Sequence, residues 1–350
     1  MRLRVSLRRI ATFALRPHDK PAQPGLLDAA TEPAVKNMLS GRIALITGGS
    51  RGLGLLLARE LGLAGCRVAI CGRSGEALEW ARVQLERQGI NALCEVCDVS
   101  QRPQVERLVE HVRRQLGPID VLVNNAGIME VGPVQHMAVE DFQQALGVMF
   151  WGTVYAALAV YPDMVQRGGG HIVNITSIGG KVSVPHLLPY STAKFAAVGF
   201  SEGLHAELAR YGVKVLTVVP GLMRTGSYAN VFVRSRPERE FTWFALAASL
   251  PLLSMDAERA ARQIVRAMVH GRAEVLLSWP ARLPAAVQGV LPGLTATVLG
   301  LVNRLILPPP GRAGGDRQRG GVVGQRLHSS LLDLATVWGR AAADRLQPPN

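Results

Sequence analysis

Short apolar segments alternate with longer amphipathic ones from Arg42 onward, and this alternation restricts the fold more than any other feature of the sequence. Apolar strands separated by amphipathic helices favour parallel pairing, with helices covering both faces of the sheet. Seven strands are predicted, at Ile43–Thr47, Arg67–Cys71, Ala92–Cys97, Asp120–Asn124, His171–Thr176, Val213–Val219 and Glu274–Leu277. Helices are predicted after the first strand through Leu63 and at 76–88, 103–116, 139–167, 190–210 and 256–269. The sequence therefore predicts an α/β fold built on a doubly wound, parallel, seven-stranded sheet.

This alternation of predicted strands and helices covers residues 41–280, and both ends of the chain depart from it. Residues 1–40 begin with a basic stretch and continue into a proline-marked segment, which predicts an extension and a linker. In the C-terminal part, 281–350, an uncharged stretch of 21 residues runs from Leu283 to Asn303. A loop is predicted at Pro308–Gly315, and a final helix at about Ser330–Leu346. We therefore expect a single domain with N-terminal and C-terminal extensions.

The formal net charge of +13 is concentrated in these extensions. Residues 1–40 carry +4 and residues 281–350 carry +5, whereas the much longer segment 41–280 carries only +4. A nucleic-acid-binding protein is expected to show a basic patch on its folded body together with a zinc-finger, RNP or similar pattern, and the sequence has neither. Nucleic-acid binding is therefore not predicted.

The four cysteines indicate neither a disulfide scaffold nor a metal site. Four cysteines in 350 residues are too few for a fold that depends on disulfides. Cys94 and Cys97 form a C-x-x-C pattern, but they lie on the predicted strand Ala92–Cys97, where residues three apart point to opposite faces. We interpret them as small apolar residues, and no metal site is predicted.

The two extensions predict contact with a membrane surface. The uncharged run Ile10–Leu15 is shorter than the apolar core of a secretory signal peptide, so a cytoplasmic protein without a signal peptide is expected. Arginines and apolar residues at helical spacing make 1–16 a candidate amphipathic helix, with a solvated tail as the alternative. The stretch 283–307 is long enough to cross a bilayer, but prolines and glycines interrupt it. We expect peripheral membrane contact through both segments; the alternative is a cover over a substrate entrance, on the same chain or in a homo-oligomer.

Groups of residues at the ends of the predicted strands carry the candidate chemistry. The turn after the first strand, Thr47–Gly54, reads T-G-G-S-R-G-L-G; its glycines let the backbone approach a pyrophosphate at the N-terminus of the next helix. The fourth strand closes with N-N-A-G at Asn124–Gly127. Ser177 follows the fifth strand, and Tyr190 and Lys194 then share one helix face because they are four residues apart. Three more residues follow the sixth strand: Pro220, Gly221 and Thr225.

In this combination the chain resembles the short-chain dehydrogenase/reductase family over about 41–280. The resemblance implies a Rossmann-like fold and an oxidoreductase whose nicotinamide dinucleotide lies across the carboxyl ends of the strands. Segment 41–280 is then the NADP(H)-binding catalytic domain, with Ser177, Tyr190 and Lys194 as catalytic residues. The residues implied to hold the cofactor are Gly48, Ser50, Arg51, Gly52, Leu53, Gly54, Arg73, Asp98, Val99, Asn125, Ala126, Gly127, Tyr190, Lys194, Pro220, Gly221 and Thr225.

The expected chemistry centres on Tyr190 as general acid and base. A phenol has an ordinary pKa of about 10, and a neighbouring ammonium group is expected to lower the pKa of Tyr190 toward neutrality. Lys194 would supply this charge and hold the nicotinamide ribose, while Ser177 would donate a hydrogen bond to the substrate oxygen. The family usually carries an asparagine where this chain has Met149, and that asparagine helps to hold a water beside the lysine. The alternative is therefore an NADP(H)-binding regulator or scaffold with little turnover.

The end of the second strand predicts NADP(H) rather than NAD(H). It reads Cys71-Gly72-Arg73-Ser74 and has no carboxylate to bind the ribose 2′-hydroxyl. Arg51 in the glycine-rich turn adds a second guanidinium group, whose planar fork suits phosphate. Asp98 and Val99, after the third strand, are expected beside the adenine.

An apolar segment after Thr225 predicts a lipophilic substrate. The family closes its active site with this region, which here contains Tyr228, Phe232, Phe241, Trp243, Phe244, Leu246, Leu250, Leu252 and Leu253. The expected reaction is hydride transfer between NADP(H) and a lipophilic carbonyl compound or secondary alcohol. The alternative is a pair of amphipathic helices that only pack against the sheet.

Overall fold

The computed structural model describes residues 35–250, 252–311, 317–327 and 336–348. Its centre is the predicted seven-stranded sheet, in the order β11-β7-β6-β4-β1-β2-β3, and all six neighbouring pairs are parallel. The strands are β1 (Ile43–Thr47), β2 (Arg67–Gly72), β3 (Ala92–Val96), β4 (Val121–Asn124), β6 (Gly170–Ile175), β7 (Val213–Val219) and β11 (Glu274–Leu276). Every strand end lies within one residue of its prediction, because near-continuous apolar runs mark strands that are covered on both faces.

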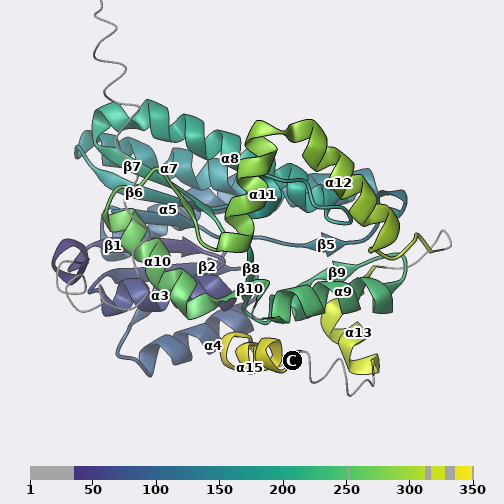
Figure 1. Ribbon diagram of the computed structural model, residues 1–350. Helices are drawn as coiled ribbons and strands as arrows, with labels where there is room; N and C mark the ends of the chain where they lie inside the picture. Colours follow the sequence, from purple (N-terminus) through teal and green to yellow (C-terminus); the bar gives the residue numbers. More distant parts are fainter. Residues whose placement is uncertain (1–34, 251, 312–316, 328–335, 349–350) are drawn as a thin grey trace, which may run out of the picture.

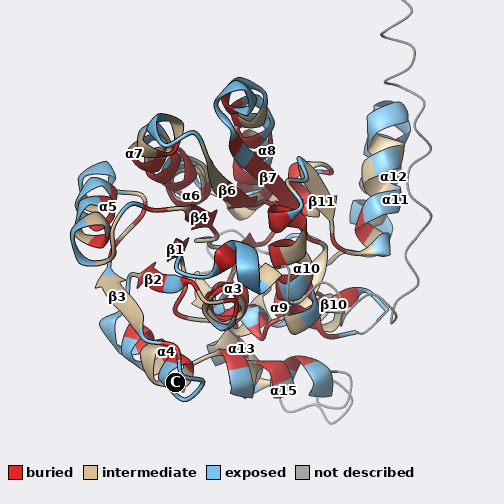
Figure 2. Ribbon diagram, turned by 90° about the vertical axis from the view of Figure 1, so that its left-hand side faces the viewer, coloured by how far each residue is buried: buried red, intermediate tan, exposed pale blue. Residues whose placement is uncertain are grey.

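Helices cover both faces of this sheet, as Figure 2 shows. One face packs against α3 (Gly52–Leu63), α4 (Gly75–Glu86) and α10 (Ala257–Val269). The other packs against α5 (Arg102–Leu116), α6 (Val139–Leu146), α7 (Gly152–Gln166) and α8 (Leu188–Leu208). Alternate strand residues enter the two cores; Leu45 packs in one and Ile46 in the other. The doubly wound fold class is therefore confirmed.

The single helix predicted at 139–167 is interrupted in the structure. A π-helical turn, Gly147–Trp151, separates α6 from α7 and contains the buried Met149. Within the described residues, Val139–Gln166 is also the one helical stretch that is long and apolar enough to cross a membrane. Half of it is buried inside the protein, so its apolar character is explained by packing against the sheet.

A smaller layer lies beyond the carboxyl edge of the main sheet (Figure 1). It contains a three-stranded sheet of β5 (Glu130–Val131), β9 (Phe232–Val233) and β12 (Gln318–Arg319), and a parallel pair of β8 (Leu222–Arg224) and β10 (Ser254–Asp256). Helices α9 (Pro237–Ser249), α13 (Gly320–Arg326) and α15 (Val337–Leu346) pack here, with the short turns η1 (Val134–His136), η3 (Ile178–Gly180) and η5 (Ser227–Asn230) between elements. A further short turn, η4 (Ala209–Tyr211), connects α8 to the start of β7. Because β12 pairs with β9, part of the C-terminal segment is built into the fold beside the aromatic segment.

The uncharged C-terminal stretch forms two helices, in line with the predicted interruption. Helix α11 spans Trp279–Val290, and α12 begins at Pro292 and continues to Leu305. Leu291 leaves the helical conformation, with φ −130° and ψ 62°, because the residue before a proline disfavours that region. Pro292 then begins α12, since proline is well tolerated in a first helical turn. The pair stands away from the main sheet in Figure 2.

Some predicted segments lie outside the described residues. These are the amphipathic helix at 1–16 and the linker after it, part of the loop at Pro308–Gly315, and the first residues of the helix predicted from Ser330; the described helix there is Val337–Leu346. The domain limits 41–280 and 281–350 stay a prediction.

Candidate active site

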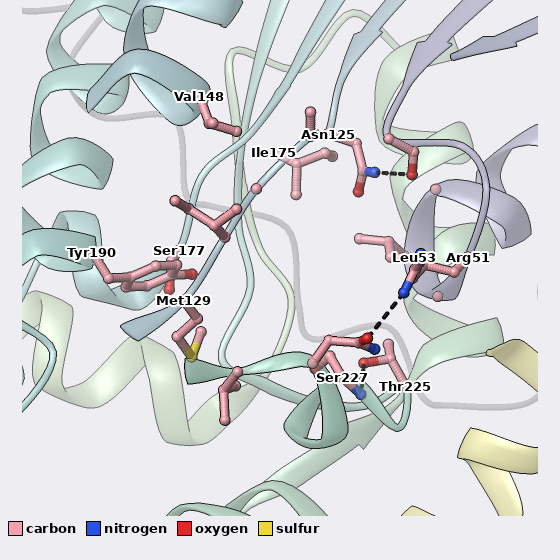
Figure 3. Close-up of a pocket in the computed structure, with 18 of the residues that line it drawn as sticks. Arg51, Leu53, Asn125, Met129, Val148, Ile175, Ser177, Tyr190, Thr225 and Ser227 are labelled. Carbon is pink, nitrogen blue, oxygen red and sulfur yellow. Dashed lines mark hydrogen bonds between the residues drawn. The ribbon is translucent and has the colours of Figure 1, made fainter. Parts of the chain in front are cut away.

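A cavity of about 950 Å³ lies at the carboxyl ends of the strands, where the strand order reverses between β1 and β4 (Figure 3). Open α/β sheets bind their ligands at this point because the chain leaves neighbouring strands in opposite directions. All the residues proposed from the sequence line it: Gly48, Ser50, Arg51, Gly52, Leu53, Gly54, Arg73, Asp98, Val99, Asn125, Ala126, Gly127, Ser177, Tyr190, Lys194, Pro220, Gly221 and Thr225.

The glycine-rich turn forms one wall of the cavity, and its close packing leaves no room for side chains. Gly48 and Gly52 adopt positive φ angles of 62° and 55°. A Cβ atom on Gly54 would lie 2.2 Å from the carbonyl oxygen of Gly48. Helix α3 starts directly after this turn, and Arg51 at its N-cap makes no side-chain cap hydrogen bond. The first N–H groups of α3 therefore face the cavity as donors suited to a pyrophosphate.

Thr47 and Asn125 join the ends of β1 and β4 beneath this turn. The Thr47 hydroxyl accepts hydrogen bonds from the backbone N–H groups of Asn125 (3.0 Å) and Ala126 (3.1 Å). The Asn125 side-chain amide donates in return to the carbonyl oxygens of Thr47 and Gly48, each at 3.0 Å. Asn125, proposed from the sequence as a cofactor contact, thus uses its amide N–H groups to hold the turn in place.

Ser177, Tyr190 and Lys194 come together on the opposite wall. Ser177 follows β6, and Tyr190 lies one helical turn before Lys194 on α8. Figure 3 shows Ser177 and Tyr190 side by side at the cavity. The Lys194 ammonium lies 5.8 Å from the centre of the Tyr190 ring and donates to the carbonyl oxygen of Ile175 at 2.8 Å. A proton donor, a hydroxyl partner and a cation therefore share one end of the cavity.

The pKa directions at this end differ from the expectation. Burial raises the pKa of Tyr190, and its hydrogen bond with Ser177 acts in the opposite direction without reversing the shift. Burial also lowers the pKa of Lys194 to about 8. The predicted lowering of the Tyr190 pKa by Lys194 is therefore not seen in this arrangement, because desolvation of the phenol outweighs its hydrogen bond with Ser177.

Three arginines gather at the other end of the cavity. Burial and the nearby guanidinium groups of Arg319 and Arg73 lower the pKa of Arg51. All three side chains line the cavity, and none forms an ion pair within the described part of the chain. Such unpaired like charges favour a bound polyanion. With the free N–H groups of α3, they make the site fit a dinucleotide that carries an additional phosphate.

The C-terminal segment adds residues that the sequence analysis missed. Arg51 donates to Asn230 at 2.9 Å, and the Asn230 amide donates to Gln347 at 2.8 Å. Gln347, just after α15, then donates to the carbonyl oxygen of Thr225 at 2.7 Å. Gln347 and Arg319 therefore reach the cavity from positions more than 90 residues beyond Thr225. Apolar spacing in the sequence gives no signal for such contacts.

Apolar side chains line the cavity beside Tyr190: Ile128, Met129, Val148, Val184, Leu187, Leu222, Met223, Phe232, Trp243, Phe244 and Ala248. The Trp243 indole donates to the buried carboxylate of Glu240 at 2.8 Å, and His186 shares the same oxygen at 2.8 Å. Tyr228 and Phe241 instead fill the core of the smaller layer. Part of the aromatic segment thus lines the cavity, and part of it packs in the core of the smaller layer.

Within the described parts of the chain, the cysteines and other candidate metal ligands form no cluster. Cys97 contacts Cys71 of the neighbouring strand, not Cys94, and this thiol contact and burial raise the pKa of Cys71. Among the residues that the structure describes, no three His, Cys, Asp or Glu side chains are placed to hold a metal ion.

Comparison with known proteins agrees with this geometry. Residues 42–234 match the family model described as short chain dehydrogenase. The chain is 41% identical over 191 residues to a candidate ketoacyl reductase of Streptomyces coelicolor, covering 54% of this chain and 73% of that protein. It is 35% identical over 187 residues to gluconate 5-dehydrogenase of Gluconobacter oxydans, covering 53% and 73%.

Solved structures show the same similarity. Gluconate 5-dehydrogenase from Burkholderia cenocepacia, in complex with NADP and tartrate, has a TM-score of 0.61 and 28% identity, covering 71% of this chain and 99% of that one. A variant of actinorhodin polyketide ketoreductase with NADPH has a TM-score of 0.61 and 33% identity, covering 69% and 97%.

Proposed function

The chain belongs to the short-chain dehydrogenase family of oxidoreductases, and we propose that it transfers a hydride between NADP(H) and a lipophilic carbonyl compound or secondary alcohol. The observation that carries this proposal is the placement of Ser177, Tyr190 and Lys194 at one end of a cavity whose other end gathers unpaired arginines. A reacting carbonyl group and a phosphate-bearing cofactor thus find complementary groups in one continuous site.

The proposed catalytic roles follow from hydrogen-bonding capacity. A nicotinamide dinucleotide, when bound, supplies or accepts the hydride. Tyr190 donates its phenolic proton to the substrate oxygen during reduction and accepts a proton from the alcohol during oxidation. Ser177 donates a hydrogen bond to the same oxygen, and Lys194 holds the ribose from one helical turn further along α8. The pKa of Tyr190 is raised by burial, and the protonated phenol is the form that can donate to the substrate oxygen in reduction.

The preference for NADP(H) rests on the charge at the arginine end. Arg73 follows β2 directly, where a carboxylate would repel a 2′-phosphate, and Arg51 and Arg319 add two further cations. The solved relatives with NADP and NADPH support the same preference.

The lipophilic substrate class rests on the lining beside Tyr190. Ordered recognition of a sugar acid needs several polar groups, whereas the lining residues that share apolar clusters with Tyr190 include Met129, Val148, Leu187 and Trp243. Among the relatives, the ketoacyl and polyketide reductases therefore suggest the substrate better than the gluconate dehydrogenases. We propose an acyl-chain or ring ketone of low polarity.

The second candidate function is a cofactor-binding regulator with little turnover. Met149 favours it, because this side chain is 1% exposed in the π-helical turn and its thioether accepts hydrogen bonds only weakly. A protein of this kind would bind NADPH tightly and turn over no substrate.

A turnover screen distinguishes the two functions. The purified chain is incubated with NADPH and a panel of apolar ketones and aldehydes, with 5-ketogluconate as a polar comparison, and consumption of NADPH is followed by absorbance. We expect turnover of the apolar ketones, and loss of turnover in Tyr190→Phe with NADPH affinity retained, since the ring still packs but has no proton to transfer. Tight NADPH binding without turnover of any compound would support the regulator instead. Equal turnover in the Phe variant would remove Tyr190 from its role.

A further inference from the structure

The hairpin of α11 and α12 exposes far more apolar surface than a helix pair in water normally does. Nine large apolar side chains in it are at least 50% exposed: Trp279, Leu283, Val290, Leu291, Leu294, Val298, Leu301, Leu305 and Ile306. Four of them, Leu294, Val298, Leu301 and Leu305, recur at helical spacing and form one stripe along α12. Figure 2 shows the hairpin apart from the body, and α12 contacts the rest of the protein mainly through α11.

The polar groups of the hairpin are arranged for apolar surroundings. No acidic residue occurs between Trp279 and Ile306. The hydroxyl groups of Thr295 and Thr297 donate to carbonyl oxygens of their own helix, those of Leu291 and Gly293, at 3.2 and 3.0 Å. Such bonding satisfies the hydroxyls without water or a protein partner. A protein–protein interface would instead need polar groups at its rim that remain available to a partner.

The charges of the hairpin lie far from its turn. Arg282 is in the first turn of α11 and Arg304 in the last turn of α12; both are exposed, and neither forms an ion pair among the described residues. At 1.5 Å per residue, they lie about 13 and 20 Å along the helices from Leu291. The hydrocarbon layer of one bilayer leaflet is about 15 Å thick. The apolar turn can therefore enter the acyl chains of one leaflet while both guanidinium groups stay at the lipid phosphates.

We propose that the α11–α12 hairpin inserts into one leaflet of an anionic lipid bilayer and holds the catalytic domain at the membrane surface. Helices of 12 and 14 residues are too short to cross the bilayer, so the hairpin enters from one side and returns. Its first helix packs at the cavity edge: a Cβ atom on Gly221 would lie 3.4 Å from Cβ of Ala281. The membrane thus lies beside the site and can deliver a lipophilic substrate to it.

Vesicle flotation of the full chain tests the proposal. Vesicles of phosphatidylcholine alone are compared with vesicles that also contain phosphatidylserine, and Leu294→Asp is compared with Val96→Asp, a matched change at an exposed valine on β3 that is 63% exposed. We expect the wild type and Val96→Asp to float with the anionic vesicles, and Leu294→Asp to lose at least about tenfold in vesicle binding. Replacing both Arg282 and Arg304 by glutamine should remove the preference for phosphatidylserine.

A second readout reports insertion at the hairpin itself. Brominated lipids quench tryptophan at short range, so Leu294→Trp places a reporter near the turn of the hairpin, where the side chain is 53% exposed. Quenching by brominated acyl chains should increase in Leu294→Trp and stay at the wild-type level in Val96→Trp, since Val96 is exposed on β3. Equal flotation of Leu294→Asp and wild type would overturn the proposal, as would no flotation of any form. A lipid-free dimer that Leu294→Asp dissociates would show that a second copy covers the hairpin, and would overturn it as well.

Discussion

The buried charge of Lys194 is expected to lower the free energy of unfolding of this protein. The variant Lys194→Met measures the size of this effect. The side chain is 5% exposed, and its Nζ donates a hydrogen bond to the carbonyl oxygen of Ile175 at 2.8 Å. Burial lowers the pKa of this amine from 10.5 to about 8. Because a tenfold change in proton affinity corresponds to about 1.4 kcal/mol, the buried charge costs about 3 kcal/mol of folding stability at pH 7.

Methionine removes the charge and retains most of the apolar volume. It also leaves the Ile175 carbonyl oxygen without a donor, at a cost of about 1–2 kcal/mol. The variant is therefore expected to be about 1–2 kcal/mol more stable than the wild type at pH 7, while its catalytic turnover is lost. Stability would come at the expense of function at this position.

The pH dependence gives this prediction its sharpest form. Below pH 8 the folded and unfolded states of the wild type both carry the proton, so the full cost is present. Between about pH 8 and 10.5 the folded state has released the proton and the unfolded state still holds it, so wild-type stability rises with pH. The advantage of Lys194→Met should shrink by about 2 kcal/mol between pH 7 and pH 9.5, to roughly zero.

Urea unfolding at the two pH values, without added cofactor, measures both quantities. Lys214→Met is the matched control, since Lys214 is exposed on β7, and it should show no pH-dependent difference from the wild type. A Lys194→Met variant that is less stable than the wild type at pH 7, or equally stabilised at both pH values, would refute the reasoning.

Three further predictions concern the arginine end of the cavity, its mouth, and the buried Glu240 carboxylate that holds Trp243 at the substrate end. Arg73→Asp should shift the ratio of kcat/KM for NADPH and NADH toward NADH by at least about tenfold, because it replaces attraction of a phosphate by repulsion; an unchanged ratio would exclude Arg73 from the site. Gln347→Ala removes two hydrogen bonds at the cavity mouth and should speed NADPH release about tenfold in stopped-flow fluorescence, and an unaltered rate would mean that this contact does not restrain the cofactor. Glu240→Ala should reduce the free energy of unfolding by about 2–5 kcal/mol in urea, because His186 and Trp243 lose their buried partner; a change below about 0.5 kcal/mol would contradict this.

Local patterns in the sequence predicted the sheet and a candidate site at the carboxyl ends of its strands. Apolar runs such as Val213–Val219 identify their strands directly, and residues after parallel strands meet at one edge. The interruption at Gly147–Trp151 was not predicted, because a π-helical turn keeps the helical periodicity on both sides. Gln347 was also missed: its partners Asn230 and Thr225 lie 117 and 122 residues away, and such pairing depends on the folded backbone.

The position of Gln347 has a consequence for synthesis on the ribosome. Gln347 follows Thr225 by 122 residues. The glycine-rich turn, helix α8 and Thr225 itself therefore all leave the ribosome well before Gln347 does. At roughly 5–20 residues per second, this interval lasts roughly 6–25 s. During that time the nascent domain can pair β1 to β7 and admit a dinucleotide through an uncovered entrance. The last described helix then docks over a site that already holds its cofactor, so the order of translation favours assembly of the loaded form.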